Sequence, residues 1–414
     1  MAETIVLAYS GGLDTSVATK WLQEERGYDV VCLTIDLGRL PDVDAARERG
    51  MAAGAKAVEL VDAKDDFLRF FAFPALAANA RYEGAYPLAT ALGRPLIAKL
   101  LVDKAREVGA SAVAHGCTGK GNDQVRLDVA IHALAPDLKI VGTARENEMT
   151  RDEAIAYAER HGIPVRTTLA SPYSTDENLW GRSIECGILE DPWAAPPEDI
   201  HEWTKPLNAT PAEAEEVEIG FEHGVPVSLN GEDLPSVELV SQLSDIAGRH
   251  GIGRIDMVEN RLVGIKSREI YEAPAAVVLL EAHQALEALT LSKQQVRWKA
   301  LVAQEYADLI YNGQWFSAHH RDLAAYVQST QRHVTGKVRM RLWHGTAVAT
   351  GRFSEESLYS HALATYGEGD QFDQSAAQGF IKLWGLPLEV QAQAQMLREP
   401  GDPLRLARPR DTED

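Results

Sequence analysis

The sequence has no long apolar run and no dense cluster of basic residues. None of its 414 residues begins a stretch that approaches the roughly 18 apolar residues of a membrane-spanning helix. The N-terminus, MAETIVLAYS, looks like the start of a strand and lacks the charged and apolar parts of a signal sequence. Acidic side chains number 61 against 41 basic ones, a net charge of −20. Because phosphate backbones and anionic membranes are bound through clustered cations, we expect a cytoplasmic protein with neither nucleic acid nor membrane as its main partner.

Cysteine is also scarce. Cys32, Cys117 and Cys186 are isolated in the sequence and form no C-x-x-C pair. This pattern is typical of a protein from a reducing compartment, without a zinc site or a disulfide framework. The sequence shows no internal repeat and no low-complexity segment, and its length is comfortable for two domains with separate cores.

The most informative segment is a glycine turn near the N-terminus. An apolar run from Thr4 to Leu7 predicts a strand and an amphipathic stretch from Val17 to Glu25 predicts a helix, with Gly11 and Gly12 between them. Glycines let the backbone approach a ligand closely, and the N–H groups and positive dipole end of the helix favour an anion. Ser10, Thr15 and Ser16 add hydroxyl donors on both sides of the glycines. The turn therefore predicts a phosphate-binding loop, although a turn without a ligand remains the alternative.

The spacing within this turn decides which phosphate loop it is. The segment lacks the lysine of G-x-x-x-x-G-K-[ST], which excludes a kinase-type or GTPase-type loop. Its glycines are adjacent, which excludes the dinucleotide fingerprint G-x-G-x-x-G. The remaining pattern, S-G-G-x-D-[ST]-S, resembles the pyrophosphate loop (PP-loop) of the ATP pyrophosphatases, which cleave ATP to AMP and pyrophosphate.

The first 168 residues alternate short continuous apolar runs with helical patterns, which predicts a doubly wound α/β domain. Such strands are typical of a parallel sheet covered on both faces. We expect strands at Thr4 to Leu7, Val30 to Ile35, Lys56 to Val61, Ser111 to Ala114 and Lys139 to Val141. We expect helices at Val17 to Glu25, Val43 to Ala53, Pro95 to Glu107 and Asp152 to Arg160, the last with a capping box of Thr150 and Glu153.

The pattern of apolar residues changes after Pro172, and residues 169–369 are predicted to form an α+β domain. Following an extended connection at Pro192 to Pro211, we expect strands at Val217 to Phe221 and Val225 to Leu229, and a hairpin of Lys337 to Trp343 with Thr346 to Thr350 that turns at His344-Gly345. Helical patterns cover Val237 to Arg249, Pro274 to Ala288 and Lys293 to Ile310. Residues 370–398 predict a helical oligomerisation arm, Gln374 to Leu397, interrupted by Pro387, and residues 399–414 a mobile tail.

A second glycine-rich loop, HGCTGKGNDQVR from His115, follows the expected strand Ser111 to Ala114 and again precedes a helical pattern. Carboxyl ends of parallel strands meet at one sheet edge, so both loops should border one composite site for ATP and a second reactant.

Four segments together resemble argininosuccinate synthase: AYSGGLDTS from Ala8, HGCTGKGNDQVR from His115, SPYSTDENLWGRS from Ser171 and GRIDMVENRLVGIKSREIYEAP from Gly253. They occur in the order of that family and spread over about Thr4 to Phe380. The resemblance implies a PP-loop domain followed by a synthetase domain. It also implies that citrulline and aspartate are joined to give argininosuccinate, while ATP is split to AMP and pyrophosphate through a citrullyl-AMP intermediate.

The resemblance also implies which residues bind each reactant. Those expected to bind ATP are Ala8, Tyr9, Ser10, Gly11, Gly12, Leu13, Asp14, Thr15, Ser16, Ile35 and Gly116, with Mg²⁺ carried by ATP and no metal site in the protein. Aspartate-binding positions are Thr118, Asn122 and Asp123. Citrulline-binding positions are Tyr86, Asn122, Arg126, Ser174, Ser183, Glu259 and Tyr271. The residues expected to take part in catalysis are Ser10, Asp14, Asp123 and Arg126, and the family implies a homotetramer.

Simpler structural interpretations stay open for single residues. Asn122 and Asp123 could only cap a helix, Tyr86 could be a half-buried strut, and Glu259 could be a solvated surface charge. Two positions also depart from the family pattern. Ala91 stands where many members carry a serine near citrulline, so that one hydrogen bond is missing or comes from Thr90, and Arg39 replaces a usual glutamine.

Other functions are compatible with the first loop alone. Thiolation of tRNA needs catalytic cysteines and a basic RNA-binding face, and glutamine-dependent amidation needs a glutaminase nucleophile; the chain offers none of these. An ATP-binding regulatory module without chemistry is the third alternative, which the second loop and the long second domain disfavour. Release of pyrophosphate only when citrulline is present would separate an enzyme of the predicted kind from a binding module.

Overall fold

The computed structural model describes residues 2–38, 43–147, 149–164 and 172–396. Arg39, the residues near Ser171 that open the third resembling segment, and the predicted tail at 399–414 therefore lie outside the described residues. Contacts divide the chain into two compact units, Met1–Leu358 and Tyr359–Asp414.

A five-stranded sheet with the order β3-β2-β1-β4-β5 forms the N-terminal part of the first unit. All of its neighbouring strands run parallel, and Leu7 at its centre lies opposite Cys32 on one side and Ala114 on the other. This confirms the predicted parallel sheet. The strands are β1 Thr4–Ala8, β2 Asp29–Asp36, β3 Ala57–Asp62, β4 Ala112–His115 and β5 Lys139–Gly142.

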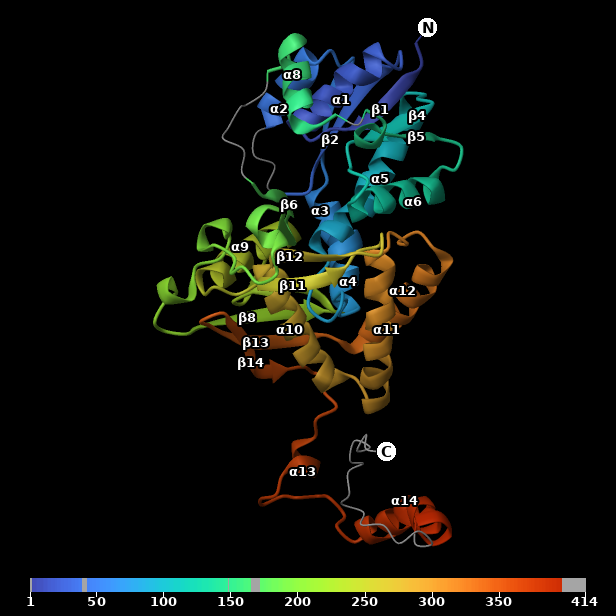
Figure 1. Cartoon of the computed structure of the whole chain (residues 1–414). Helices are drawn as coiled ribbons and strands as arrows, with labels where there is room; N and C mark the ends of the chain where they lie inside the picture. The colour runs from blue at the N-terminus through green and yellow to red at the C-terminus, as the bar shows by residue number, and fades with distance from the viewer. Residues whose placement is uncertain (1, 39–42, 148, 165–171, 397–414) are drawn as a thin grey trace, which may run out of the picture. The chain divides into compact units, whose positions relative to one another are not determined.

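Helices cover both faces of this sheet (Figure 1). Strand residues such as Ile5 and Leu7 pack with Trp21 on one face, while Val6 packs with Leu101 on the other, because successive side chains of a strand point to opposite sides. The first face is covered by α1 Leu13–Glu24 and α2 Val43–Ala52, with α8 Arg151–Arg160 packed on α1; the second is covered by α5 Ala89–Glu107 and α6 Asn122–Leu134. A four-residue helix, α7 Thr143–Glu146, follows β5. The capping box of Thr150 and Glu153 is confirmed.

Two antiparallel sheets make up most of the second part of the same unit. One has the order β10-β9-β8-β13-β14 and contains the predicted hairpin of β13 with β14; the other has the order β11-β12-β7-β6. Their strands are β6 Ser174–Asn178, β7 Gly181–Glu185, β8 Glu215–Glu222, β9 Val225–Leu229, β10 Glu232–Asp233, β11 Arg254–Asn260, β12 Lys266–Glu272, β13 Gly336–Trp343 and β14 Thr346–Phe353. The predicted α+β character is confirmed, but the four-stranded sheet was not predicted.

One hydrophobic core joins these sheets to helices from distant parts of the chain. Phe67 and Leu76, which precede α5 in the sequence, share this core with Leu279 and Tyr306. The helices of this part are α3 Lys64–Phe67, α4 Phe73–Ala77, α9 Ser236–Arg249, α10 Pro274–Thr290, α11 Lys293–Tyr311 and α12 Ala318–Thr330. A π-helical turn, Leu68–Ala72, joins α3 to α4, and 3-10 turns occur at Gly187–Glu190, Glu198–Ile200, Leu207–Ala209 and Gln331–His333.

The second unit contains α13 His361–Ala364 and α14 Ala376–Gln391, followed by a π-helical turn, Ala392–Met396. The expected interruption at Pro387 is wrong, since α14 runs through it. The helix continues there although proline has no backbone N–H to donate. Leu383 is 72% exposed and Trp384 74% exposed, and the ring of Phe380 stacks on that of Trp384 with centroids 5.6 Å apart.

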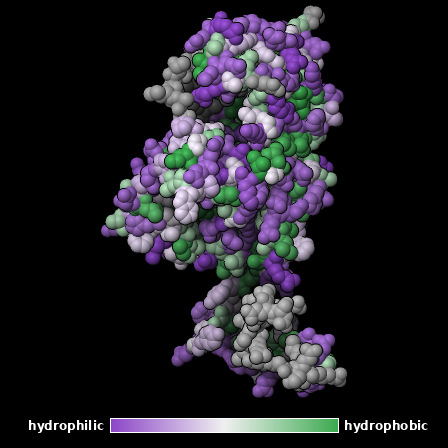
Figure 2. Space-filling view, in the orientation of Figure 1, coloured by the Kyte–Doolittle hydropathy of each residue, from purple (hydrophilic) through white to green (hydrophobic). Residues whose placement is uncertain are grey.

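Within the described residues, no helix is both long and apolar enough to cross a membrane. On the face drawn in Figure 2, hydrophilic side chains are spread over the surface, and the hydrophobic ones form separate patches.

Candidate active site

The predicted phosphate loop lies between the end of β1 and the start of α1. Gly11 has φ +76°, a conformation that side-chain-bearing residues rarely adopt. A Cβ atom at Gly11 would also lie 2.7 Å from the Cβ of Ala46 on α2. Gly12 is the N-cap of α1, and no side chain caps the helix there. The N-terminus of α1 is thus open for an anion, as the sequence predicted.

Hydrogen bonds fix the shape of this loop. Ser10 Oγ accepts from the N–H of Gly12 at 3.3 Å and lies 3.1 Å from Thr15 Oγ1. Arg49 Nε on α2 donates to the carbonyl oxygen of Gly11 at 2.7 Å. The loop thus contacts α2 on one side, and its other side is open toward the carboxyl end of the sheet.

Ser16 does not behave as a surface-loop residue. It is buried, and its hydroxyl lies 2.9 Å from the hydroxyl of Tyr9. The resemblance implies that this hydroxyl takes part in binding ATP, but here it contacts Tyr9 and does not line the cavity at the end of the sheet.

A cavity of 680 Å³ opens at the carboxyl end of β1, β2 and β4. The strand order reverses between β1 and β4, which is where doubly wound sheets bind their ligands. Neither Gly11 nor Ser16 is among the residues of its wall. The predicted ATP-binding residues that line it are Ala8, Tyr9, Ser10, Gly12, Leu13, Asp14, Thr15, Ile35 and Gly116.

The second glycine-rich loop borders the same cavity through His115, Gly116 and Cys117. His115 Nδ1 accepts from the N–H of Cys117 at 3.2 Å, so its proton resides on Nε2, which lies 2.6 Å from Asp128 Oδ1. Arg145 donates to Asp128 at 2.9 Å as well. This chain of contacts fixes the start of the loop, and the two predicted loops lie side by side at the sheet edge, as expected.

A smaller cavity of 210 Å³ lies beside the first. All seven predicted citrulline-binding residues and Asp123 line it, whereas Thr118 is exposed in the loop before α6 and lines neither cavity. The four-stranded sheet supplies one wall. Asp176, Ser183 and Tyr271 stand opposite one another across β6, β7 and β12, so their side chains share one face of the sheet.

Glu259 on β11 is buried, not a solvated surface charge. Its two carboxylate oxygens accept hydrogen bonds from the hydroxyls of Tyr271, at 2.6 Å, and Tyr311, at 2.5 Å. Burial and the neighbouring carboxylates raise the pKa of the Tyr271 and Tyr311 hydroxyls, which therefore stay protonated and act as donors. A carboxylate held in this way can receive an ammonium group from the cavity.

Asn122 and Tyr86 both contact other residues at the smaller cavity. Asn122 is buried at the start of α6; its amide donates to Tyr311 at 2.8 Å and accepts from the N–H of Leu262 at 2.9 Å. Tyr86 is 1% exposed and stacks on Tyr271 with ring centroids 3.9 Å apart. The contacts of both residues position the wall of the cavity.

Thr90, the residue before Ala91, brings a hydroxyl to the smaller cavity. Thr90 lines the cavity, and its hydroxyl lies 2.7 Å from that of Tyr86. Ala91 is fully buried and does not line the cavity. The hydroxyl at this wall of the cavity thus comes from residue 90, whereas many family members carry a serine hydroxyl at residue 91.

Arg126 and Asp123 form an ion pair on α6 at 2.9 Å. Arg126 Nε also donates to the carbonyl oxygen of Tyr311 at 2.8 Å, and its guanidinium lies 4.6 Å from the centre of the Tyr311 ring. Gly313 permits this approach, because a Cβ atom there would lie 2.7 Å from the Cα of Arg126. Tyr311 thus contacts Arg126, Asn122 and Glu259, although nothing in its sequence context indicated a role in the site.

Arg94 on α5 and Asp176 on β6 were also missed. One nitrogen of Arg94, Nη2, contacts both Asp123, at 2.7 Å, and Asp176. Arg94, Thr175 and Asp176 line both cavities, so the two cavities meet at this contact. Although burial raises it, the guanidinium groups of Arg94 and Arg126 hold the pKa of Asp123 below its usual range. Burial and the charge of Asp123 raise the pKa of Asp176 more than Arg94 lowers it.

A third group of charges lines the far wall of the smaller cavity. Arg261 contacts Glu185 and lies 2.6 Å from Glu269. Burial, together with the charges of Glu185 and Glu259, raises the pKa of Glu269 to about 8. The carboxyl group of Glu269 is therefore harder to ionise than that of an ordinary glutamate.

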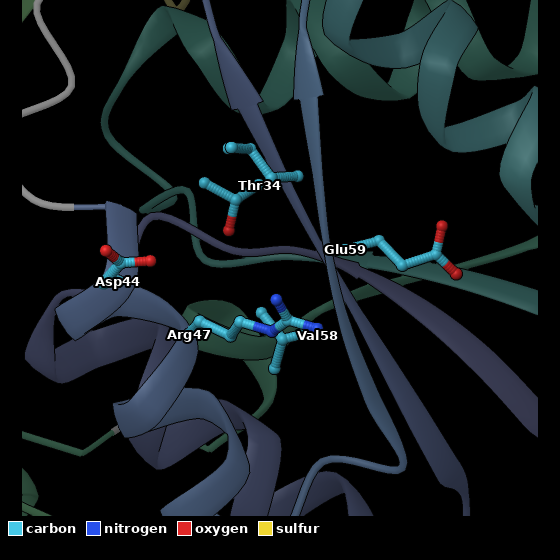
Figure 3. Close-up of a pocket in the computed structure, with 6 residues that line it drawn as sticks. Thr34, Asp44, Arg47, Val58 and Glu59 are labelled. Atoms are coloured by element: carbon cyan, nitrogen blue, oxygen red, sulfur yellow. The ribbon is translucent and has the colours of Figure 1, made fainter.

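A separate cavity of 380 Å³ lies between α2 and the strands β2 and β3 (Figure 3). Thr34, Asp44 and Arg47 are among the residues that line it. None of the residues predicted from the sequence to bind ATP, aspartate or citrulline borders it.

Comparisons with known proteins agree with the resemblance seen in the sequence. Residues 4–164 match the profile of the "Arginosuccinate synthase N-terminal HUP domain", and residues 173–391 match that of the "Arginosuccinate synthase C-terminal domain". Proteins named argininosuccinate synthase from Dehalococcoides mccartyi and Brevibacillus brevis are each 57% identical to the chain. The first similarity spans 96% of this chain and 98% of the relative, and the second 94% and 93%. A third, from Gloeobacter violaceus, is 56% identical over 95% of this chain and 99% of its own.

Among solved structures, the U34-tRNA thiolase NcsA from Methanococcus maripaludis is 19% identical to the chain. The likeness has a TM-score of 0.27 and covers 42% of this chain and 61% of that one, too little to bear on fold or function.

Proposed function

Because the chain belongs to the argininosuccinate synthase family, we propose that it ligates citrulline to aspartate at the expense of ATP, with AMP and pyrophosphate as by-products. The observation that carries this proposal is the meeting of two cavities at one contact. The larger one contains the pyrophosphate loop, the smaller one contains the predicted amino-acid-binding residues, and Arg94 and Asp176 border both. ATP and an amino acid bound there would react across this junction.

The pyrophosphate loop receives the triphosphate of ATP. The open N-terminus of α1 and the hydroxyls of Ser10 and Thr15 donate to phosphate oxygens. Ile35 at the end of β2 and Gly116 in the second loop border the space for adenosine. Gly11 provides the left-handed backbone conformation of the turn, and the hydroxyl of Ser16 holds the Tyr9 hydroxyl in position.

The smaller cavity receives the amino acids. Glu259 binds the α-ammonium group of citrulline, and Ser174, Ser183 and Tyr86 bind its other polar atoms. Asp123, which contacts Arg94 at the junction, binds aspartate together with Asn122, and Thr118 of the exposed loop donates to its carboxylates. Arg126 pairs with Asp123 and contributes positive charge beside the ureido group.

The chemistry explains why these groups are needed. A ureido carbon is a poor electrophile, since the nitrogen lone pairs feed electron density to it. The ureido oxygen attacks the α-phosphorus of ATP, pyrophosphate leaves, and the oxygen becomes a good leaving group. The amine of aspartate then attacks the carbon and AMP departs. The protein contributes mainly position and charge stabilisation, with Ser10 and Asp14 at the first step and Arg126 and Asp123 beside the ureido group.

Mg²⁺ enters with ATP in this proposal. The described residues contain no group of three or more His, Cys, Asp or Glu side chains that could hold a metal ion. Asp14 lines the cavity and is exposed at the first turn of α1, and Mg²⁺ bound to phosphates needs only one or two carboxylates. The ion would neutralise the charge of the departing pyrophosphate.

Thiolation finds little support in the site. Burial raises the pKa of the Cys117 thiol to about 12, so that the only cysteine beside the cavity among the described residues is a poor nucleophile at neutral pH. We further propose that the protein is cytoplasmic and forms a homotetramer, as the family resemblance implies. The exposed Phe380, Leu383 and Trp384 of α14 offer an apolar surface for a neighbouring subunit.

The proposal is tested by measuring AMP and pyrophosphate across pairs of amino acids. Only citrulline together with aspartate should give sustained release of both products and a new compound with the mass of argininosuccinate. Release without citrulline, or equal release with any amino acid, would contradict the proposal.

A further inference from the structure

The ligation step requires a proton acceptor that the roles above do not supply. Aspartate enters with an α-ammonium group, whose nitrogen has no free electron pair. One proton must therefore leave before the nitrogen can attack the adenylated ureido carbon. An acceptor must have an ionised carboxylate or a neutral amine at the junction of the two cavities, and it must be accessible to a bound substrate.

Four of the carboxyl groups around the junction are poorly suited to this task. Asp123 is held by Arg94 and Arg126, which lower its pKa, and a carboxylate stabilised in this way is a weak base. Glu259 is occupied by two tyrosine hydroxyls. Glu269 lies 2.6 Å from the guanidinium of Arg261 and does not line the larger cavity. Glu177 lines the larger cavity but not the smaller one, so it does not stand at the junction.

Asp176 has the required position. It lines both cavities, and 41% of its side chain is exposed. Its carboxylate contacts the same nitrogen of Arg94 that binds Asp123, so an ammonium group beside Asp123 lies within reach of Asp176. The strand pairing places Ser183 and Tyr271 of the citrulline wall in the same row as Asp176.

The charges around Asp176 favour proton transfer in the required direction. Arg94 faces it from α5, and Asp123 with Arg126 from α6; Cys117 in the second loop, and Glu177 with its partner Arg182, complete its surroundings. Asp123 forms ion pairs with the guanidinium groups of Arg94 and Arg126, whereas Asp176 pairs with that of Arg94 alone. When the environments of two neighbouring carboxyl groups shift their pKa values in opposite directions, the group with the lower pKa stays ionised and the other can accept a proton.

We propose that Asp176 accepts the proton from the α-ammonium group of aspartate, while Asp123 stays ionised and holds that group in place. The carboxylate of Asp176 becomes a carboxylic acid, and the freed electron pair of nitrogen forms the bond to the ureido carbon. The carbon–oxygen bond to AMP breaks, and its electron pair leaves on the phosphate oxygen. The new nitrogen substituent loses its surplus proton to water, which leaves a guanidinium product, and Asp176 returns its proton to solvent.

This inference rests on the proposed function, and its test separates the two. The isotope exchange between pyrophosphate and ATP, measured with citrulline and Mg²⁺ but without aspartate, reports adenylation alone. Failure of the unmodified protein to show this exchange would contradict the proposed function. When exchange is present, Asp176→Asn should retain it within about threefold, while ligation at saturating aspartate falls about a hundredfold or more, the usual contribution of a general base.

Hydroxylamine distinguishes a proton acceptor from a binding residue. Its nitrogen is unprotonated at neutral pH, so it can attack the adenylated carbon without a base. Asp176→Asn should therefore capture hydroxylamine at close to the unmodified rate, and Asp176→Glu should recover part of the ligation with aspartate. The matched control is Asp256→Asn, on the same sheet, whose carboxylate pairs with Arg268 away from both cavities.

Three results would overturn the inference. One is ligation by Asp176→Asn within threefold of the unmodified rate. Another is a defect confined to the KM for aspartate or citrulline, which would make Asp176 a binding residue. The third is an equal loss of exchange and ligation. If Asp176→Asn does not fold, the pH dependence of the unmodified protein is the test. The rate of ligation with aspartate should fall more steeply at acid pH than the rate of capture of hydroxylamine. Identical pH profiles for the two reactions would refute the inference.

Discussion

The hydroxyl of Tyr311, at the C-terminal end of α11, donates a hydrogen bond of 2.5 Å to the buried carboxylate of Glu259 on β11. The same hydroxyl accepts from the amide of Asn122 at 2.8 Å. Tyr311 thus connects a residue proposed to bind citrulline with one proposed to contact both amino acids. Its ring also stacks on Tyr82, with centroids 3.5 Å apart, so its position does not depend on the hydroxyl.

Tyr311→Phe should raise the KM for citrulline about tenfold and change the KM for ATP little. The variant keeps the stacked ring but leaves Glu259 with one donor, and a hydrogen bond to a charged group contributes about 1.5–3 kcal/mol. Steady-state kinetics with each substrate varied in turn would measure this. Tyr306→Phe, on the same helix and in the hydrophobic core, is the matched control; an unchanged KM for citrulline in Tyr311→Phe would show that the contact does not order the site.

The two amino-acid sites should separate by mutation. Glu259→Gln should weaken citrulline about ten- to a hundredfold, because it removes the charge that faces an ammonium group, with a small effect on aspartate. Thr118→Ala should do the reverse. The citrulline-dependent exchange of pyrophosphate into ATP isolates the citrulline site, and equal effects of both variants on both substrates would refute the division.

Asp14→Asn should abolish pyrophosphate release while leaving the thermal unfolding temperature nearly unchanged. Its side chain is exposed and lines the ATP cavity, so its loss affects the ligand and not the core. Ser10→Ala should act in the same direction, but less strongly. Asp152→Asn, a similarly placed residue in the first turn of α8, is the control, and wild-type turnover by Asp14→Asn would remove this residue from the pyrophosphate loop's function.

Glu269 should make stability fall as the pH rises. Its folded-state pKa of about 8 lies above the ordinary value of 4.5, so the folded protein retains a proton that the unfolded chain releases between these values. The stabilisation is present at low pH and is lost as the pH approaches and passes 8, with a slope of at most about 1.4 kcal/mol per pH unit. Urea unfolding from pH 5 to 9 should show a smaller slope for Glu269→Gln, while Glu232→Gln, exposed on β10, should follow the unmodified protein. Equal slopes for all three proteins would contradict this assignment.

Truncation after Gly369 should lower the mass measured by light scattering. The removed segment includes α14, whose exposed Leu383 and Trp384 are proposed to pack on a neighbouring subunit. The double variant Leu383→Ser with Trp384→Ser should have the same effect, and Lys382→Ala should not. If the full-length protein is already monomeric at micromolar concentration, the proposed assembly is wrong.

The sequence predicted the parallel sheet well because its signals are local. Continuous apolar strands such as Val30 to Ile35 are buried, and stretches with helical periodicity separate them. The pyrophosphate loop could be identified for the same reason, since Ser10, Gly11, Gly12, Asp14 and Thr15 are neighbours in the chain.

The four-stranded sheet gave no such signal. One face of β6, β7 and β12 borders a polar cavity, so Asp176, Ser183 and Tyr271 stand where an ordinary strand would carry apolar residues. Only the family resemblance pointed to Ser174, Ser183, Glu259 and Tyr271. Long-range pairing of strands, which brings these residues together, leaves no trace in hydrophobic periodicity.

Arg94 was missed because the start of α5 was misplaced. Proline is common at the first position of a helix, and the sequence therefore predicted a start at Pro95. The helix begins at Ala89 instead, after Leu88 in the left-handed conformation, and Pro95 lies inside it. This adds Thr90 and Arg94 to a helix that borders the site. Tyr311 was missed because its role depends on Gly313 and Arg126, which meet only in the folded chain.

The most direct test follows one oxygen atom. Citrulline labelled with ¹⁸O in its ureido group is incubated with the protein, ATP, Mg²⁺ and aspartate, and the products are analysed by mass spectrometry. Adenylation of the ureido oxygen predicts that one ¹⁸O atom appears in AMP for each argininosuccinate formed, and that pyrophosphate stays unlabelled. Unlabelled AMP, or label recovered in pyrophosphate, would contradict the account.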